Sequence, residues 1–128
     1  MNTQTNEADN VIDNVNAPKH YTSHASGIEC IQIAELLPFN LGNSIKYLWR
    51  SDLKWDKQED TKKAIFYLRR QVSLGEYPFY TATDHSQIKH FLKLIKAVDV
   101  KLYTTCYIIT FGTFTQWISL AKKLEREL

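Results

Sequence analysis

Hydrophobic and polar residues separate cleanly along residues 41–50, LGNSIKYLWR. Each residue of an α-helix turns by about 100°, so positions three and four apart share a face. On such a helix the apolar side chains form one stripe, made of Leu41, Ile45, Leu48 and Trp49. The opposite stripe is made of Asn43, Lys46, Tyr47 and Arg50. The pattern predicts an amphipathic helix that joins a core on one side and presents two cations and an amide on the other.

The same periodicity predicts a helix on each side of this segment. An earlier helix is expected over 28–37, where Pro38 ends it. A later helix is expected over 57–74, where Gly75 ends it. Because the connection between 51 and 56 is short, this later helix should run antiparallel to the helix at 41–50.

The second half of the chain also has helical periodicity, with one ambiguous stretch. Asp84 and Gln87 resemble a capping box, and apolar residues continue at helical spacing as far as Leu102. A last helix is expected over 113–127, whereas 103–111 suits either a helix or a strand. We therefore expect an all-α fold, a small bundle of about five helices that forms a single domain.

Composition and charge limit the partners of this domain. The chain of 128 residues has a formal charge of +2, and three acids without any Lys or Arg lie in residues 1–17, so the remainder carries +5. Residues 1–17 are polar and poor in aromatics, which predicts a flexible, disordered tail before a helical domain over 18–128. The mild excess of positive charge suits anionic small molecules and does not indicate specific nucleic-acid binding. Two distant cysteines, Cys30 and Cys106, indicate a reduced, cytoplasmic protein and no metal site.

Residues 102–121 form an uncharged stretch that is long enough to cross a bilayer. Five threonines, Gln116 and Ser119 make it a poor membrane span, so we expect no membrane partner. The stretch is instead predicted to be a buried segment or a homo-oligomer interface, broken near Gly112.

Candidate site residues gather on the polar sides of the predicted helices. Asp60 and Tyr67 lie on one border of the core stripe of the 57–74 helix, with Lys63 a step further out. From there Asp60 and Lys63 can face Lys46 and Arg50 across a cleft. Glu29 falls on an apolar side of the 28–37 helix and needs a cationic partner, for which Lys46 or Arg50 is the candidate. His20 and Tyr21, in the loop before it, can cover a bound base or phosphate. A solvated basic surface remains the simpler interpretation of these cations.

No motif of a P-loop, a Rossmann fold, a zinc site or a serine hydrolase occurs in the sequence. Phosphoryl transfer remains open, since it needs positive charge and aligned reactants rather than covalent chemistry from the protein. The residues at hand supply cations from Lys46, Arg50 and Lys63, with Asp60 and Glu29 to orient them or a magnesium ion.

Several short motifs follow one another along the chain: PxHY at 18–21, GIECI at 27–31, LGNxIKYLxR at 41–50, EDxxKA at 59–64 and YL at 67–68. In this order they resemble a small phage protein family described as nucleotide kinases, formerly a domain of unknown function. The resemblance covers residues 18–70, which makes 18–74 a family-like core and 75–128 a C-terminal helical extension. Gln32 departs from the family pattern, because the family often has an acid there.

The resemblance implies phosphorylation of deoxynucleoside monophosphates by an oligomeric protein in the host cytoplasm. ATP or another nucleoside triphosphate would donate the phosphate, with Mg²⁺ as companion ion. Arg50, Lys46 and Asp60 are then the expected catalytic residues. The expected substrate-binding residues are His20, Tyr21, Glu29, Asn43, Lys63 and Tyr67. If so, Arg50→Ala impairs catalysis far more than folding.

Two other functions fit the same residues. A non-catalytic phage protein would use the cations to sequester a nucleotide, or would inhibit a host protein. A helical nucleotide pyrophosphohydrolase also pairs carboxylates with Lys and Arg, although Gln32 interrupts the ExxE pattern that this class usually shows.

Overall fold

A computed structural model of the protein describes residues 24–51 and 57–128, which contain six α-helices and no strand. The helices are α2 (Cys30–Ala34), α3 (Phe39–Ser51), α4 (Lys57–Leu74), α5 (Ala82–Lys96), α6 (Val100–Phe111) and α7 (Phe114–Arg126). The all-α fold is thus confirmed, and the tail predicted over 1–17 lies outside the described residues.

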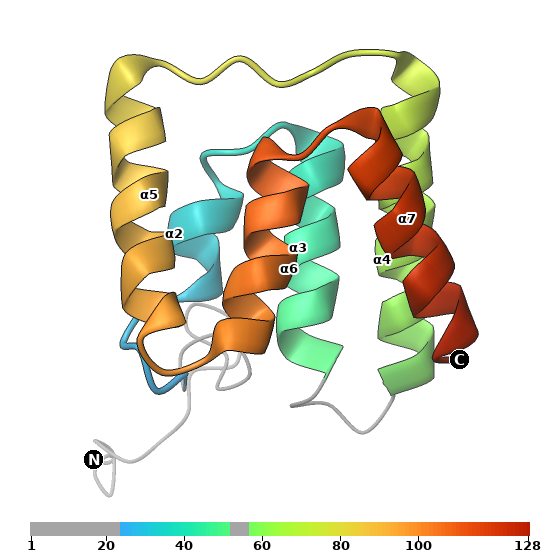
Figure 1. Cartoon of the computed structure of the whole chain (residues 1–128), viewed down its shortest axis with the longest axis horizontal. Coiled ribbons are helices and arrows are strands. Elements are labelled where there is room, and N and C mark those ends of the chain that lie inside the picture. Colours follow the sequence, from blue (N-terminus) through green and yellow to red (C-terminus); the bar gives the residue numbers. More distant parts are fainter. Residues whose placement is uncertain (1–23, 52–56) are drawn as a thin grey trace, which may run out of the picture.

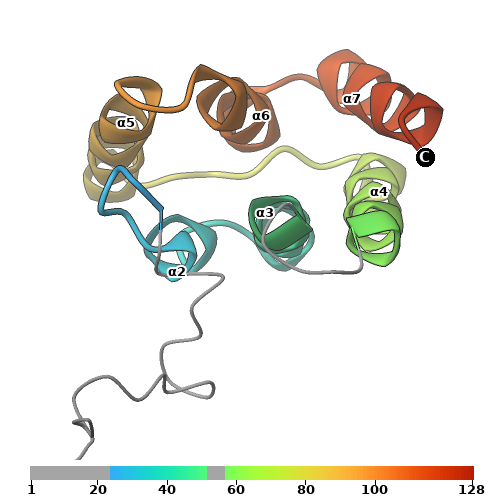
Figure 2. The same ribbon diagram turned by 90° about the horizontal axis from the view of Figure 1, so that it is seen from below.

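The helices form two layers of three (Figure 1; Figure 2). One layer contains α2, α3 and α4 in that order, and the other contains α5, α6 and α7. Helices α3 and α4 run antiparallel, as the short connection between them predicts. The segment 75–81 crosses the whole width of the molecule to join α4 to α5 (Figure 1).

The core lies between the two layers and is built from the predicted apolar stripes. On α3, Leu41, Ile45 and Trp49 are at most 4% exposed. They meet buried residues of the second layer, which include Ile88, Leu92, Ile95, Cys106, Ile109 and Trp117. Because this stripe faces the second layer, the opposite stripe of α3 faces away from it.

Two glycines permit close contacts between backbones. Gly42 lies in α3, where an added Cβ would come within 2.7 Å of the carbonyl oxygen of Ala34. Gly112 separates α6 from α7, and a Cβ there would come within 2.3 Å of the carbonyl oxygen of Ile108. The predicted break near Gly112 is therefore confirmed, while an oligomer interface at 102–121 stays a prediction.

The first helix is shorter than predicted. The sequence indicated 28–37, but α2 has only five residues, and the chain turns through 35–37 with backbone hydrogen bonds of shorter span. Ile28 and Leu37 are buried nonetheless. The spacing of apolar residues over 28–37 therefore predicted the burial of these two side chains, but not how long the helix is.

Two predictions for the second half need correction, and one open alternative is settled. Helix α5 begins earlier than Asp84, because the Thr81 side chain accepts a hydrogen bond from the Asp84 N–H and caps the helix. The helical period does not continue unbroken to Leu102, because Asp99 caps a new helix, α6, through the Leu102 N–H. The ambiguous stretch 103–111 lies in α6 and is helical. The last helix matches its prediction, with Thr113 as N-cap and Glu127 as C-cap.

Across the described ranges, no helix combines the length and the apolar character needed to cross a bilayer.

Candidate functional site

Three cationic side chains surround the ring of Tyr47. Lys46 Nζ lies 4.7 Å, Lys63 Nζ 5.3 Å and the guanidinium carbon of Arg50 5.6 Å from the ring centroid. Each cation is close enough to be stabilised by the negative face of the aromatic ring. All three distances are measured from the same ring centroid. Any two of these cationic groups therefore lie no farther apart than twice 5.6 Å. We call these four residues, with Asp60, the Tyr47 cluster.

Small residues bring α3 and α4 close enough to build this cluster. Ser44 and Ala64 are both fully buried where the two helices meet. Ser44 Oγ donates to the carbonyl oxygen of Asn40 at 3.0 Å and lies 3.4 Å from that of Ala64. This close approach places Lys63 of α4 next to the ring of Tyr47 of α3. A cleft between the two helices stays a prediction.

An ion pair fixes one of the cations. Arg50 Nε donates to Asp60 Oδ2 at 3.2 Å. The Asp60 side chain is only 1% exposed and that of Arg50 is 16% exposed. A carboxylate buried to this degree depends on a charged partner. Arg50 is therefore held at the edge of the cluster by a structural contact as well as being a candidate for ligand binding.

Lys63 and Asn43 also make local contacts. Lys63 Nζ lies 3.6 Å from Glu59 Oε1, one helical turn away, and both side chains are about half exposed. Asn43 Nδ2 donates to the backbone carbonyl of Phe39 at 2.9 Å. The Asn43 amide group thus retains its oxygen as an acceptor, and the exposed Lys63 pair is weak enough for a phosphate to replace Glu59.

A row of aromatic rings continues from the cluster along both helices. Tyr67 of α4 lies parallel to Tyr47, with ring centroids 6.0 Å apart. Tyr67 also meets Phe39 and Phe66 edge-on, at 5.8 and 5.2 Å. Phe39 and Phe66 are 72% and 62% exposed, so these two rings lie largely in solvent. We call the cluster together with this row and Asn43 the α3–α4 face.

Glu29 lies apart from this face. It directly precedes α2, and α2 and α4 lie on opposite sides of α3 (Figure 2). Its backbone N–H donates to Gln32 Oε1 at 2.7 Å, which gives Gln32 a structural role at the start of α2. No ion pair of Glu29 with Lys46 or Arg50 is found in the described part of the chain. His20 and Tyr21 lie outside that part.

The ammonium group of Lys46 also influences a buried thiol. Burial raises the pKa of Cys30 to about 12, and the nearby charge of Lys46 opposes this rise. Burial likewise raises the pKa of the Cys106 thiol. Both cysteines are free and buried, and they behave as core residues rather than nucleophiles.

The sequence analysis missed a second feature, a cavity of about 330 Å³ on another side of α3. His24, Trp49 and Asp99 are among its lining residues. His24 Nε2 lies 3.0 Å from Asp99 Oδ2, and the His24 ring contacts Trp49 with centroids 5.4 Å apart. The hydrogen bond from His24, together with that from the Leu102 N–H, lowers the pKa of Asp99. No local motif signals a pair that lies 75 residues apart in the sequence.

The fold and this site define a two-layered, all-α protein with a cationic and aromatic face on its N-terminal layer. Residues 15–69 match the model of a family described as a protein of unknown function, DUF3310. This similarity includes α2, α3 and most of α4, and with them every described residue of the α3–α4 face. Comparisons with curated proteins and with solved structures find no match.

Proposed function

We propose that the protein binds nucleotide phosphates at the Tyr47 cluster and transfers a phosphoryl group from a nucleoside triphosphate to a deoxynucleoside monophosphate. The observation that supports this proposal is the convergence of Lys46, Arg50 and Lys63 on the ring of Tyr47. Binding is the part that the geometry supports directly, and the transfer step extends it through the resemblance to nucleotide kinases.

The cluster offers the electrostatic part of phosphoryl transfer. The transferred group carries negative charge on its equatorial oxygens, and catalysis consists mainly of stabilising that charge and aligning the reactants. Arg50 is restrained by Asp60, so little of its conformational freedom is left to lose on binding. The ammonium groups of Lys46 and Lys63, at the same ring, add two positive charges. Their flexible side chains can stay in contact with the phosphates as these move during the transfer.

Magnesium usually binds through one or two carboxylates and the phosphates of the substrate. The described residues contain no group of three or more side chains suited to hold a metal. Asp60 Oδ1 is buried and has no hydrogen-bond partner within the described ranges, so one carboxylate oxygen of the cluster is not engaged. Asp60 is thus the candidate protein ligand for a Mg²⁺ ion that the triphosphate would mainly hold, and its side chain, 1% exposed, would have to become accessible for this contact.

A binding-only function is the second candidate, and one observation favours it. Glu59 and Asp60 are both ion-paired with cations of the cluster. Glu29 lies at the start of α2, on the opposite side of α3 from α4. The described acids therefore supply no obvious general base. A protein that sequesters nucleotides needs the cations alone.

One assay separates these functions. Purified full-length protein is incubated with mixed deoxynucleoside monophosphates, ATP and Mg²⁺, and the products are resolved by ion-exchange chromatography. We expect deoxynucleoside diphosphates and ADP. Stoichiometric nucleotide binding without product would instead establish sequestration, and pyrophosphate released from a triphosphate alone would establish a pyrophosphohydrolase.

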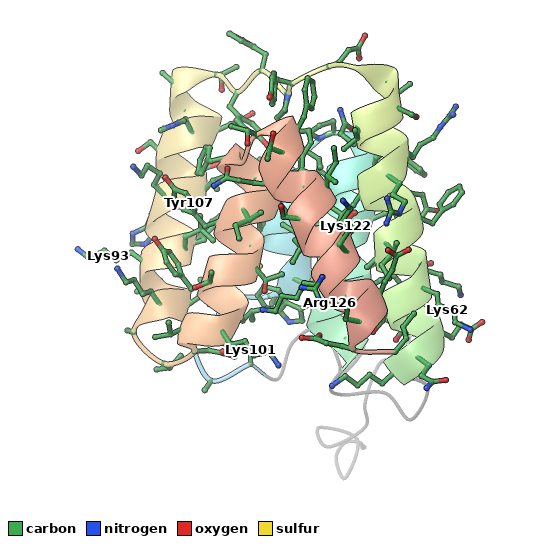
Figure 3. The ribbon with its side chains drawn as sticks, turned by 45° about the vertical axis from the view of Figure 1, so that its right-hand side comes forward. Lys62, Lys93, Lys101, Tyr107, Lys122 and Arg126 are labelled. Atoms are coloured by element: carbon green, nitrogen blue, oxygen red, sulfur yellow. The ribbon has the colours of Figure 1, made fainter. Side chains whose placement is uncertain are left out.

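Lys46→Met is the sharpest test of the site, because Lys46 is in none of the ion pairs seen among the described residues. We expect it to lower nucleotide affinity at least tenfold while leaving the fold intact. Lys122→Met is the matched control, since Lys122 is an exposed lysine on α7, in the other layer (Figure 3). Equal affinities for the two variants would refute the assignment of the cluster.

A further inference from the structure

The α3–α4 face is longer than one nucleotide requires. Phe39 and Arg50 lie at opposite ends of α3 and are separated by about 16 Å along the helix axis, at 1.5 Å per residue. A mononucleotide has a single base next to its phosphate. If its phosphate lies at the Tyr47 cluster, its base can cover the rings nearest the cluster, and Phe39 is left without a function.

The exposed rings belong to the same surface as the cations. Tyr67 contacts Tyr47 of the cluster and also the exposed rings of Phe39 and Phe66. Aromatic rings that alternate with basic groups are the common means by which proteins bind single strands. Bases stack on the rings while the cations follow the backbone.

We propose that the α3–α4 face binds single-stranded nucleic acid of two or more nucleotides, without strong sequence preference. Phosphates lie at the Tyr47 cluster and bases stack on the row formed by Phe39, Phe66 and Tyr67. This inference rests on the proposed function, because it uses the same cluster to hold the first phosphate.

Weak sequence preference follows from the groups on the face. Stacking accepts every base, whereas base readout needs donors and acceptors that are fixed in position. The Asn43 amide donates to its own helix, and the lysines on the face are flexible point charges. Base stacking also requires unpaired bases, so duplex DNA does not fit this row.

The experiment compares an oligonucleotide with its monomer. Fluorescein-labelled dT₈ and rU₈ are titrated with full-length protein and followed by fluorescence anisotropy, and dTMP binding is measured by calorimetry. The test variant is Phe39→Ala/Phe66→Ala. The matched control is Phe79→Ala, since Phe79 is 91% exposed on the 75–81 segment.

We expect the double variant to bind dT₈ at least tenfold more weakly and to bind dTMP as the wild type does, while Phe79→Ala changes neither affinity. Lys46→Met should reduce the slope of log K against log salt concentration by about 0.7, the value for one phosphate contact on a single strand. A weaker binding of rU₈ than of dT₈ would identify DNA as the preferred strand, and the reverse would identify RNA.

Two results would overturn the inference and leave the proposed function standing. One is dTMP binding by the wild type with equal dT₈ affinity for the wild type and the double variant. The other is a change of oligomeric state in the double variant, seen by light scattering, with dT₈ affinity unchanged, because the rings would then bind a second copy of the chain. Failure of dTMP to bind the wild type would refute the proposed function itself.

Loss of folding in the double variant does not prevent the test. Circular dichroism at 222 nm identifies such a loss, and the single variants Phe39→Ala and Phe66→Ala then replace it. Each removes one exposed ring, and each should weaken dT₈ binding severalfold.

Discussion

Removing the guanidinium of Arg50 should destabilise the protein, not only weaken ligand binding. Arg50 pairs with Asp60, whose side chain is 1% exposed. Arg50→Ala leaves this carboxylate buried without the positive charge that compensates it. The structure therefore changes the expectation from sequence that this variant would impair catalysis far more than folding.

The size of the effect follows from the burial of the two groups. Breaking a buried ion pair by removal of one partner costs about 3–5 kcal/mol. The Arg50 side chain is still 16% exposed, so water reaches the pair and the lower end of this range applies. A loss of about 3 kcal/mol is a large part of the stability of a small domain. At a urea dependence of about 2 kcal/mol/M, it corresponds to a midpoint about 1.5 M lower.

Urea unfolding followed by circular dichroism at 222 nm measures this change, with two further variants for comparison. Lys63→Ala removes an exposed pair with Glu59 and should lower the free energy of unfolding by about 0.5 kcal/mol or less. Arg50→Met/Asp60→Leu replaces both charges of the buried pair by apolar groups and should regain most of the lost stability.

Two outcomes would show that this reasoning is wrong. If Arg50→Ala and Lys63→Ala shift the midpoint by the same small amount, solvent screens the Asp60 pair as it does a surface pair. Alternatively, the double variant could be no more stable than Arg50→Ala, and the cost would then come from lost side-chain contacts rather than from an uncompensated charge.

Three further predictions follow from single contacts. Gly42→Ala should lower the free energy of unfolding by about 1–3 kcal/mol in urea titrations, because its Cβ would meet the backbone of Ala34 at 2.7 Å; unchanged stability would show that α2 can shift away. Asp99→Asn should be less stable than the wild type at pH 7 by less than about 1 kcal/mol, since more than a third of the side chain is exposed. The pKa of Asp99 is lowered below its ordinary 3.8, so its stabilising charge is present above that pH and is lost as the pH falls through the folded value; urea titrations at pH 7 and pH 3 should show the difference shrink, and a constant difference would contradict this origin. Cys30 and Cys106 should resist a thiol reagent in native protein and both react in urea, because burial raises the pKa of each thiol; fast labelling at neutral pH without denaturant would disprove their burial.

The antiparallel pairing of α3 with α4 could be predicted from the sequence because each of these helices has an apolar side and a polar side. Three of the four residues of the apolar stripe of α3 are buried and Leu48 is partly buried. The polar stripe has the three residues that form the cluster with Lys63 and Asp60. Helical spacing of 3.6 residues is enough to place such residues on one side of one helix. The burial of Asp60 depends on how closely α3 and α4 approach each other at Ser44 and Ala64. The spacing of residues along one helix does not predict this distance between two helices.

The errors have equally local causes. Two capping patterns overlap near the start of α5, and spacing alone does not choose Thr81 over Asp84. The turn between α5 and α6 contains neither glycine nor proline, so the helical spacing of apolar residues continues through it in the sequence. The exposure of Phe39 and Phe66 was not predicted, because it depends on which neighbours cover the two rings.

The segment 75–81 joins two layers that are each continuous in sequence (Figure 1). Its contacts are aromatic as well as polar: the Tyr77 ring stacks on that of Phe114 with centroids 4.0 Å apart, the Tyr80 ring meets that of Phe111 edge-on, and Tyr80 OH donates to the Thr110 carbonyl at 3.0 Å. Most of the affinity between the layers still comes from the larger set of buried apolar side chains rather than from the covalent link. A chain cut at the exposed Phe79 would yield two fragments with complementary apolar surfaces, suited to reassembly as a split protein whose N-terminal fragment carries the whole ligand face.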